Sequence, residues 1–111
     1  FPTRRSSDLP LNLFAEGAVR AQSAASRIAA TTSLSQRLQI AQQAYRDLDL
    51  LRPYFTGSAA VRFSSDLDSL YSYSRKGYWE TTKAILNSIS RKLNAVVAEY
   101  QRGGDGMAKY F

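Results

Sequence analysis

The sequence predicts an all-α protein whose helices form an up-down-up-down four-helix bundle. Apolar residues recur at alternating steps of three and four in four successive segments, which is the spacing of a helix with one buried face. Only short connections separate these segments, so each helix must turn back on the preceding one. The 111 residues include no cysteine, so helix packing must supply the core without disulfides. A longer, domain-swapped pair of helical hairpins is the alternative arrangement.

The first nine residues, FPTRRSSDL, differ from the rest of the chain. They have no helical or strand period, and they resemble the translation of a short-read sequencing adapter. We therefore expect residues 1–9 to be an artefact and residues 10–104 to form the bundle. Leaving out Arg4, Arg5 and Asp8 lowers the cations from 15 to 13 and the carboxylates from 9 to 8, so the net charge becomes +5.

The first two helices are expected at about residues 11–31 and 33–52. A break at Thr31–Ser33 separates them, and Ser33 with Gln36 is typical of a capping box. The second helix should end before Pro53, which lacks an amide hydrogen. The expected seams are Leu11, Phe14, Ala18, Ala21, Ala25 and Ile28 in the first helix, and Leu34, Leu38, Ala41, Tyr45, Leu48 and Leu51 in the second. Small residues in the first seam would let a neighbouring helix approach closely.

The other two helices are expected at about residues 59–76 and 78–102. Ser58 is the candidate N-cap of the third helix, and Gly77 and Gly103 each follow cationic residues at a helix end, as a left-handed C′ glycine does. The expected seams are Ala59, Ala60, Phe63, Leu67, Leu70 and Tyr71, and then Trp79, Thr82, Leu86, Ile89, Leu93, Val96 and Tyr100. Residues 105–111 are expected to be a C-terminal tail.

The composition argues against catalysis. The chain has no histidine, which removes the commonest general base and metal ligand, and no phosphate-binding glycine loop precedes a helix. Four of the aspartates occur as two i,i+2 pairs, Asp47 with Asp49 and Asp66 with Asp68. Because that spacing points side chains to different sides of a helix, we expect solvated ion pairs with Arg46 or Arg62. We predict a non-enzyme without a cofactor, a metal site or a small-molecule substrate.

Cations cluster in the last third of the chain near Tyr73, Tyr78 and Trp79. Such a mixture can bind single-stranded nucleic acid. Some of these cations are explained by helix termination, however, so we favour a basic surface for an acidic protein partner. The candidate docking residues are Arg75, Lys76, Lys83, Arg91, Lys92 and Arg102.

Three stretches together resemble a known family. Leu67-Asp-Ser-Leu70-Tyr71, Arg75-Lys-Gly-Tyr78-Trp79 and the helix ending Leu93-Asn-Ala-Val-Val are similar to the C-terminal helical hairpin of PsbQ-type extrinsic proteins of photosystem II. Ser35-Gln-Arg-Leu38 through Leu48 is similar to the helix before that hairpin. The likeness extends from Leu34 to Tyr100 and is that of a divergent, algal member. The proline-rich N-terminal arm of plant members has no counterpart in the sequence.

The resemblance implies a non-catalytic subunit in the chloroplast thylakoid lumen, peripheral to the membrane. Its expected partners are the photosystem II core and the other extrinsic lumenal subunits, and its expected role is to stabilise the oxygen-evolving complex and its retention of calcium and chloride. Photosystem I or the chloroplast NDH complex are alternative hosts. Two further readings remain open: a helical subunit that binds another protein, and a basic nucleic-acid-binding bundle.

Overall fold

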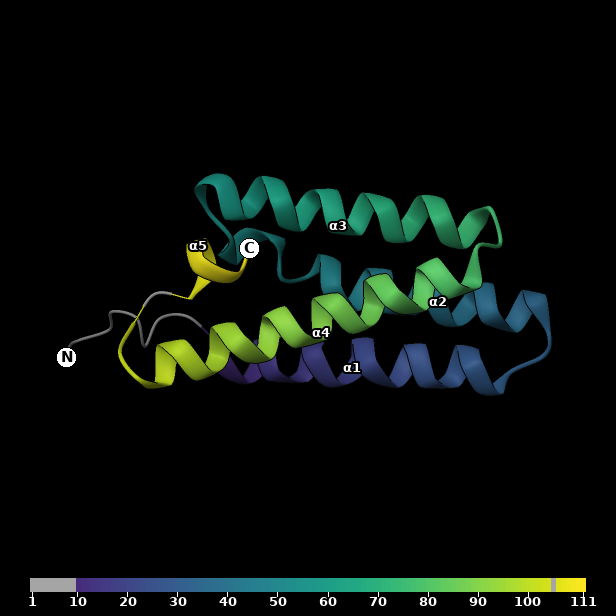
Figure 1. Cartoon of the computed structure of the whole chain (residues 1–111), viewed down its shortest axis with the longest axis horizontal. Helices are drawn as coiled ribbons and strands as arrows, with labels where there is room; N and C mark the ends of the chain where they lie inside the picture. The colour runs from purple at the N-terminus through teal and green to yellow at the C-terminus, as the bar shows by residue number, and fades with distance from the viewer. Residues whose placement is uncertain (1–9, 105) are drawn as a thin grey trace.

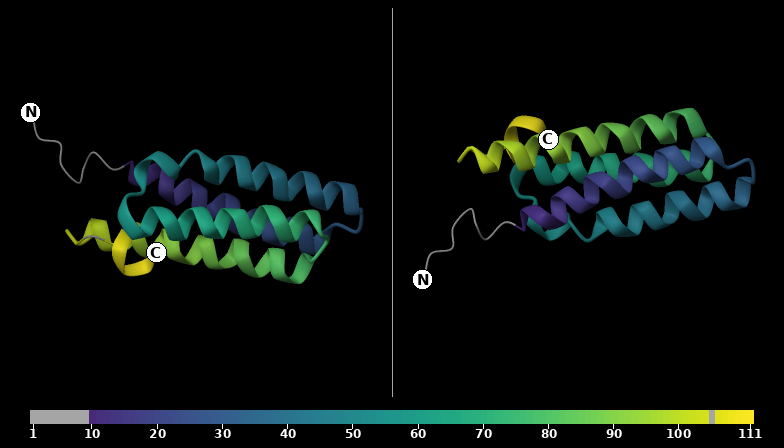
Figure 2. Two further views of the ribbon diagram at one scale, coloured as in Figure 1. Left: turned by 90° about the horizontal axis from the view of Figure 1, so that it is seen from above. Right: turned by 90° about the horizontal axis from the view of Figure 1, so that it is seen from below.

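The protein is an all-α four-helix bundle (Figure 1). The computed structural model describes residues 10–104 and 106–111, so our expectation for residues 1–9 falls outside it. The helices are α1 (Leu11–Ala30), α2 (Leu34–Asp49), α3 (Gly57–Arg75), α4 (Trp79–Gln101) and the short α5 (Met107–Tyr110). Helix α1 packs against α2 and α4, and α3 packs against the same two helices from the other side (Figure 2). This is the predicted up-down-up-down arrangement.

The most extensive helix contact joins α1 to α4. The small residues Ala18, Ala21 and Ala25 of α1 are buried there, and the Ser90 hydroxyl of α4 donates a 2.8 Å hydrogen bond to the Ala18 carbonyl oxygen. A side chain as short as serine can reach a backbone carbonyl of the next helix only when the two backbones lie close together. The close approach expected from the small residues of the first seam is therefore confirmed.

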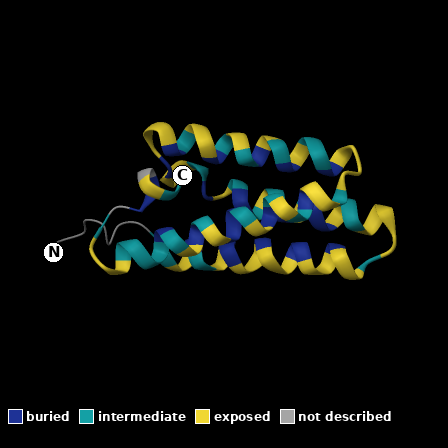
Figure 3. Cartoon of the chain, in the orientation of Figure 1, coloured by how far each residue is buried: buried dark blue, intermediate teal, exposed yellow. Residues whose placement is uncertain are grey.

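The buried faces of the four helices point to one common core (Figure 3). In α4 the predicted seam is buried from Thr82 to Val96. Two predicted core positions are wrong: Leu34 is 64% exposed and Tyr71 is 47% exposed. Leu34 is the first residue of α2, at the end of the bundle. Tyr71 instead lies against the ring of Tyr45 in α2, with the ring centroids 5.5 Å apart.

The connection between α2 and α3 differs from the predicted loop. Helix α2 ends at Asp49 instead of residue 52, and a 3₁₀-helix follows at Arg52–Tyr54. Pro53 occupies its first turn, where a missing amide hydrogen costs little. The Arg52 guanidinium binds Asp49, donates a 2.7 Å hydrogen bond to the Ser64 hydroxyl and a 3.3 Å one to the Tyr45 hydroxyl. The hydrogen bond to Asp49 raises the pKa of Arg52 above its usual value. This arginine therefore joins α2, the connection and α3.

Apart from the end of α2, the helix ends follow the local signals with one exception. The Ser33 hydroxyl accepts a hydrogen bond from the Gln36 amide, as predicted for the start of α2. Helix α3, however, begins at Gly57 with Thr56 as its N-cap, so Ser58 is not the cap. Helices α1 and α4 match the predicted bounds within one residue at each end.

Both predicted glycine stops are confirmed. Gly77 has φ +79° and Gly103 has φ +90°, values that favour glycine. After α3 the Tyr78 amide donates to the Tyr73 carbonyl and the Gly77 amide to the Ser74 carbonyl. After α4 the amide of Gly104 donates to the carbonyl of Glu99 in the same way. These hydrogen bonds form Schellman motifs, which satisfy the last carbonyl groups of each helix.

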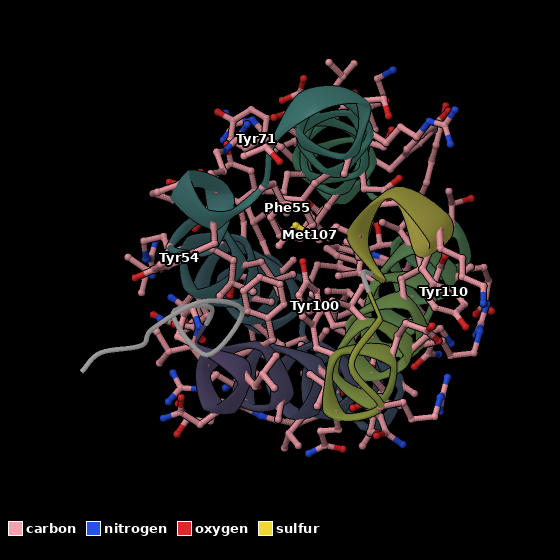
Figure 4. All side chains as sticks on the ribbon, turned by 90° about the vertical axis from the view of Figure 1, so that its left-hand side faces the viewer. Tyr54, Phe55, Tyr71, Tyr100, Met107 and Tyr110 are labelled. Atoms are coloured by element: carbon pink, nitrogen blue, oxygen red, sulfur yellow. The ribbon has the colours of Figure 1, made fainter. Side chains whose placement is uncertain are left out.

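The C-terminal segment, which we expected to be a tail that frays unless it docks, is docked in the residues that the structure describes. Helix α5 packs against α3 and α4, and Met107 and Phe111 are buried. The Phe111 ring lies 5.0 Å from the Phe55 ring and 5.6 Å from the Phe63 ring, both edge-on. Figure 4 looks at this end and shows Phe55 and Met107 enclosed by the helices. An aromatic cluster thus closes the bundle where its core would otherwise meet water.

Candidate docking surface

Four contacts between neighbouring helices define the middle level of the bundle. They join Ala18 to Ser90, Arg20 to Asp47, Tyr45 to Tyr71 and Asp66 to Lys92. Residues 21–46 and 70–88 therefore lie on the side of the two loops at 31–33 and 76–78, on the right in Figure 1. We call these two segments the basic half, and the remaining described residues the mixed half.

Net charge is concentrated in the basic half. It contains one carboxylate, Glu80, and six cations: Arg27, Arg37, Arg46, Arg75, Lys76 and Lys83. The described residues of the mixed half contain seven cations and six carboxylates. The basic half therefore has a charge of +5, and the mixed half is close to neutral. A field of one sign at one end attracts and orients a partner of the opposite sign.

Ion pairs explain the neutrality of the mixed half. Asp47 lies 3.4 Å from Arg20, Asp49 binds Arg52, and Asp66 lies 3.1 Å from Lys92. The predicted partners Arg46 and Arg62 do not form these pairs. Arg46 donates to the Gln43 amide oxygen, and Arg62 donates to the main-chain oxygen of Phe111. Three of the four predicted aspartates are therefore paired, but with cations from α1, from the connection after α2 and from α4.

The structure divides the six predicted docking residues between the two halves. Arg75, Lys76 and Lys83 lie in the basic half, whereas Arg91, Lys92 and Arg102 lie in the mixed half. Arg75 and Lys76 are exposed and lie over aromatic rings. Lys83 pairs with Glu80 at 2.9 Å, Lys92 pairs with Asp66, and Arg102 pairs with Glu99. Arg91 is exposed in the middle of α4. The six residues therefore do not form one continuous patch.

Aromatic side chains accompany the cations at the end of the basic half. The Lys76 ammonium lies 5.6 Å from the centre of the Tyr73 ring, which is 5.8 Å from the ring of Tyr78. The Arg37 guanidinium lies 5.9 Å from the Trp79 ring and donates a 2.6 Å hydrogen bond to the Thr31 carbonyl oxygen. Arg37 therefore holds the two loops together, while Lys76 remains exposed to a partner.

Three cations of this surface were absent from the sequence-based candidates. Arg27, Arg37 and Arg46 come from α1 and α2, far along the chain from Arg75 and Lys76. A signal for them existed, because Arg27 and Arg37 lie at similar distances on either side of the break at residues 31–33. Folding the sequence at that break would have placed both near the end of the bundle.

Two hollows on neighbouring faces of the bundle share Arg46. The larger, about 750 Å³, lies between α1 and α2 and is lined by Arg27, Ala30, Thr31, Gln36, Gln39, Ile40, Gln43 and Arg46. The smaller, about 290 Å³, lies between α2 and α3 and is lined by Ala41, Gln42, Tyr45, Arg46, Tyr71, Ser74 and Arg75. Both hollows have two arginines and no carboxylate among their lining residues. They extend the basic surface from the loops onto the sides of the bundle.

Over residues 10–104 and 106–111, no cluster of three or more His, Cys, Asp or Glu side chains could hold a metal ion. Within the same residues, no helix has the length and hydropathy needed to cross a membrane. Comparison with protein families, with curated proteins and with solved structures yields no match to this chain. The resemblance to PsbQ-type proteins therefore depends on the quoted residues alone.

Proposed function

We propose that the protein is a non-catalytic docking subunit that binds an acidic surface of a larger protein assembly through its basic half. From the resemblance to PsbQ-type proteins, we further propose that this assembly is photosystem II on its lumenal side. There the bundle would stabilise the oxygen-evolving complex and its retention of calcium and chloride.

The separation of charge supports this proposal. Repulsion among the six cations of the basic half is relieved by one carboxylate only, whereas the acidic groups of the mixed half are largely neutralised within the molecule. An acidic partner would supply the missing counter-charges, and the field would orient the bundle with its loops toward that partner. The absence of histidine and cysteine from the sequence is in keeping with a binding role.

The aromatic residues of the basic half bear on the nucleic-acid alternative. Stacking of bases needs free ring faces. Lys76 and Tyr78 lie against Tyr73, and Arg37 lies over Trp79, so the Tyr73 and Trp79 rings are partly covered within the protein. This arrangement favours a protein partner over single-stranded nucleic acid.

Binding to salt-washed photosystem II membranes tests the proposal. Lys76→Glu should weaken binding about tenfold at low salt, because it reverses a charge in the basic half. The matched control is Arg91→Glu, an exposed reversal in the mixed half, and should change affinity less than about threefold. The difference should shrink above about 0.1 M salt, where charges are screened beyond about 10 Å.

Circular dichroism of both variants would establish that they are folded. An equal loss of membrane binding in Lys76→Glu and Arg91→Glu would contradict a docking role for the basic half. Tight binding of the wild type to single-stranded DNA, with a steep salt dependence and no binding to the membranes, would support the nucleic-acid alternative instead.

A further inference from the structure

The hollow between α2 and α3 has a composition suited to a carboxylate. Arg46 and Arg75 lie on its rim, and both side chains are exposed. Arg46 donates a 2.8 Å hydrogen bond to the neutral Gln43 side chain, and Arg75 lies 5.1 Å from the centre of the Tyr71 ring. Neither guanidinium has a carboxylate partner among the described residues. Guanidinium groups bind carboxylates through paired, charge-assisted hydrogen bonds.

The walls of the hollow are held in place by the fold. The Tyr45 hydroxyl accepts a hydrogen bond from Arg52, which is itself bound to Asp49 and Ser64. The Tyr45 and Tyr71 rings meet at 5.5 Å, one from each helix. Figure 4 shows Tyr71 beside α3, on the side that faces α2. A bound segment would meet these rings without reordering them, which lowers the entropic cost of binding.

We propose that this hollow is the anchor for an acidic segment of the partner protein. A glutamate or aspartate side chain of that segment binds between Arg46 and Arg75, and its methylene groups or an adjacent apolar side chain pack on Tyr45 and Tyr71. This inference rests on the proposed function and deepens it, because it assigns one hollow of the basic surface as the specific site.

Size and ring geometry favour a side chain over a nucleobase. A hollow of about 290 Å³ is at the small end of ligand pockets and suits one or two amino-acid side chains. Arg75 lies over the Tyr71 ring, in the position that a stacked base would take, while Tyr71 stays 47% exposed and can still be contacted by a side chain.

The probe for the test is a fluorescein-labelled peptide, Glu-Glu-Gly-Phe-Gly-Glu-Glu, measured by fluorescence anisotropy at about 0.1 M salt. Its control is the same peptide with glutamine in place of every glutamate. The wild-type protein should bind the first peptide and not the second. Amide NMR signals of Ala41 and Ser74, which line the hollow, should shift most on binding.

Two double variants separate the hollow from the general field of the basic half. Arg46→Gln with Arg75→Gln removes both arginines of the hollow and should weaken peptide binding at least about tenfold. Arg27→Gln with Lys76→Gln removes two charges from the same half without touching the hollow, and should weaken binding less than about threefold. Exposed positions were chosen in both variants so that the fold is retained.

Equal weakening in the two double variants would overturn the anchor and leave the proposed docking function standing, since the field alone would then explain binding. No binding of the glutamate peptide by the wild type, or shifts located away from Ala41 and Ser74, would also overturn the anchor. Failure of the proposed function itself would be seen separately, as loss of binding to the photosystem II membranes by the wild type.

Discussion

Small side chains of α1 determine how closely α4 can approach it. Ala18, Ala21 and Ala25 bring the backbones together, and the buried Ser90 hydroxyl finds its acceptor in the Ala18 carbonyl. The alanines were predictable from the step of three and four. The role of Ser90 was not, because a serine near an apolar seam has no local signal that distinguishes a buried hydrogen bond from an exposed hydroxyl.

The two wrong core positions have different causes, because Leu34 lies at the end of the bundle and Tyr71 lies at the edge of the buried face of α3. Leu34 and Tyr71 continue the apolar spacing of their helices, yet both are exposed. Ile40 and Ala44 are buried in α2 although the predicted seam omitted them. An apolar spacing fixes a buried face only to within about one residue position, and the neighbouring helices settle which residue faces the core.

Truncation of Ile89 tests the centre of the bundle. This side chain is fully buried in the middle of α4. Ile89→Ala should lower the free energy of unfolding by about 2–4 kcal/mol, through lost transfer energy and a cavity that closes only in part. Urea unfolding measures the change. Val19→Ala is the control, because Val19 is 64% exposed and its truncation should cost less than about 0.5 kcal/mol. A loss below about 1 kcal/mol at Ile89 would show that the core is looser than described.

At the scale of whole elements, the helix ends were predictable where the signal is local. Ser33 and the glycines at 77 and 103 specify their ends through hydrogen bonds within a few residues. Helix α5 could not be predicted in this way. It has four residues and no side-chain cap, and Phe111, directly after it, packs on the rings of Phe55 and Phe63, which are distant in sequence.

Gly106 tests how α5 is held against α4. A Cβ at this position would lie 2.9 Å from the Val96 Cα atom and 2.9 Å from the Glu99 Cβ atom. Since a helix backbone cannot yield as a side chain can, Gly106→Ala should displace α5 and cost about 1–3 kcal/mol in urea unfolding. Lys109→Ala is the control, because that exposed side chain makes only surface contacts, a 3.8 Å ion pair to Glu99 and a contact with the Tyr110 ring. Unchanged stability of Gly106→Ala would mean that α5 packs less closely than described.

At the scale of the molecule, the separation of charge depends on helix register. Basic residues are spread along the whole sequence, and a net charge of +6 says nothing about where they meet. Only the antiparallel alignment, marked by contacts such as Tyr45 with Tyr71, places Arg27 and Arg46 in the same half as Arg75. The last third of the chain looked like one basic surface, but α4 runs through both halves and distributes its cations between them. Lys92 of α4 and Arg102, which directly follows that helix, are paired within the mixed half.

A surface kept for an acidic partner should reduce the stability of the free protein. The cations of the basic half repel one another, and at about 0.01 M salt this repulsion extends over about 30 Å. Replacing Arg27 and Lys76 by glutamine should therefore raise the melting temperature by about 1–3 °C at that salt concentration, as expected for a few tenths of a kcal/mol in a domain of this size. The gain should disappear at about 0.15 M salt, where the repulsion is already screened. Calorimetry of the wild type and the double variant at both salt concentrations measures this change in melting temperature.

Arg91→Gln in the mixed half should show no such gain, because carboxylates there balance the cations. A lower melting temperature for the double variant at low salt would mean that Arg27 and Lys76 stabilise the fold, and would remove the argument that they are held for a partner.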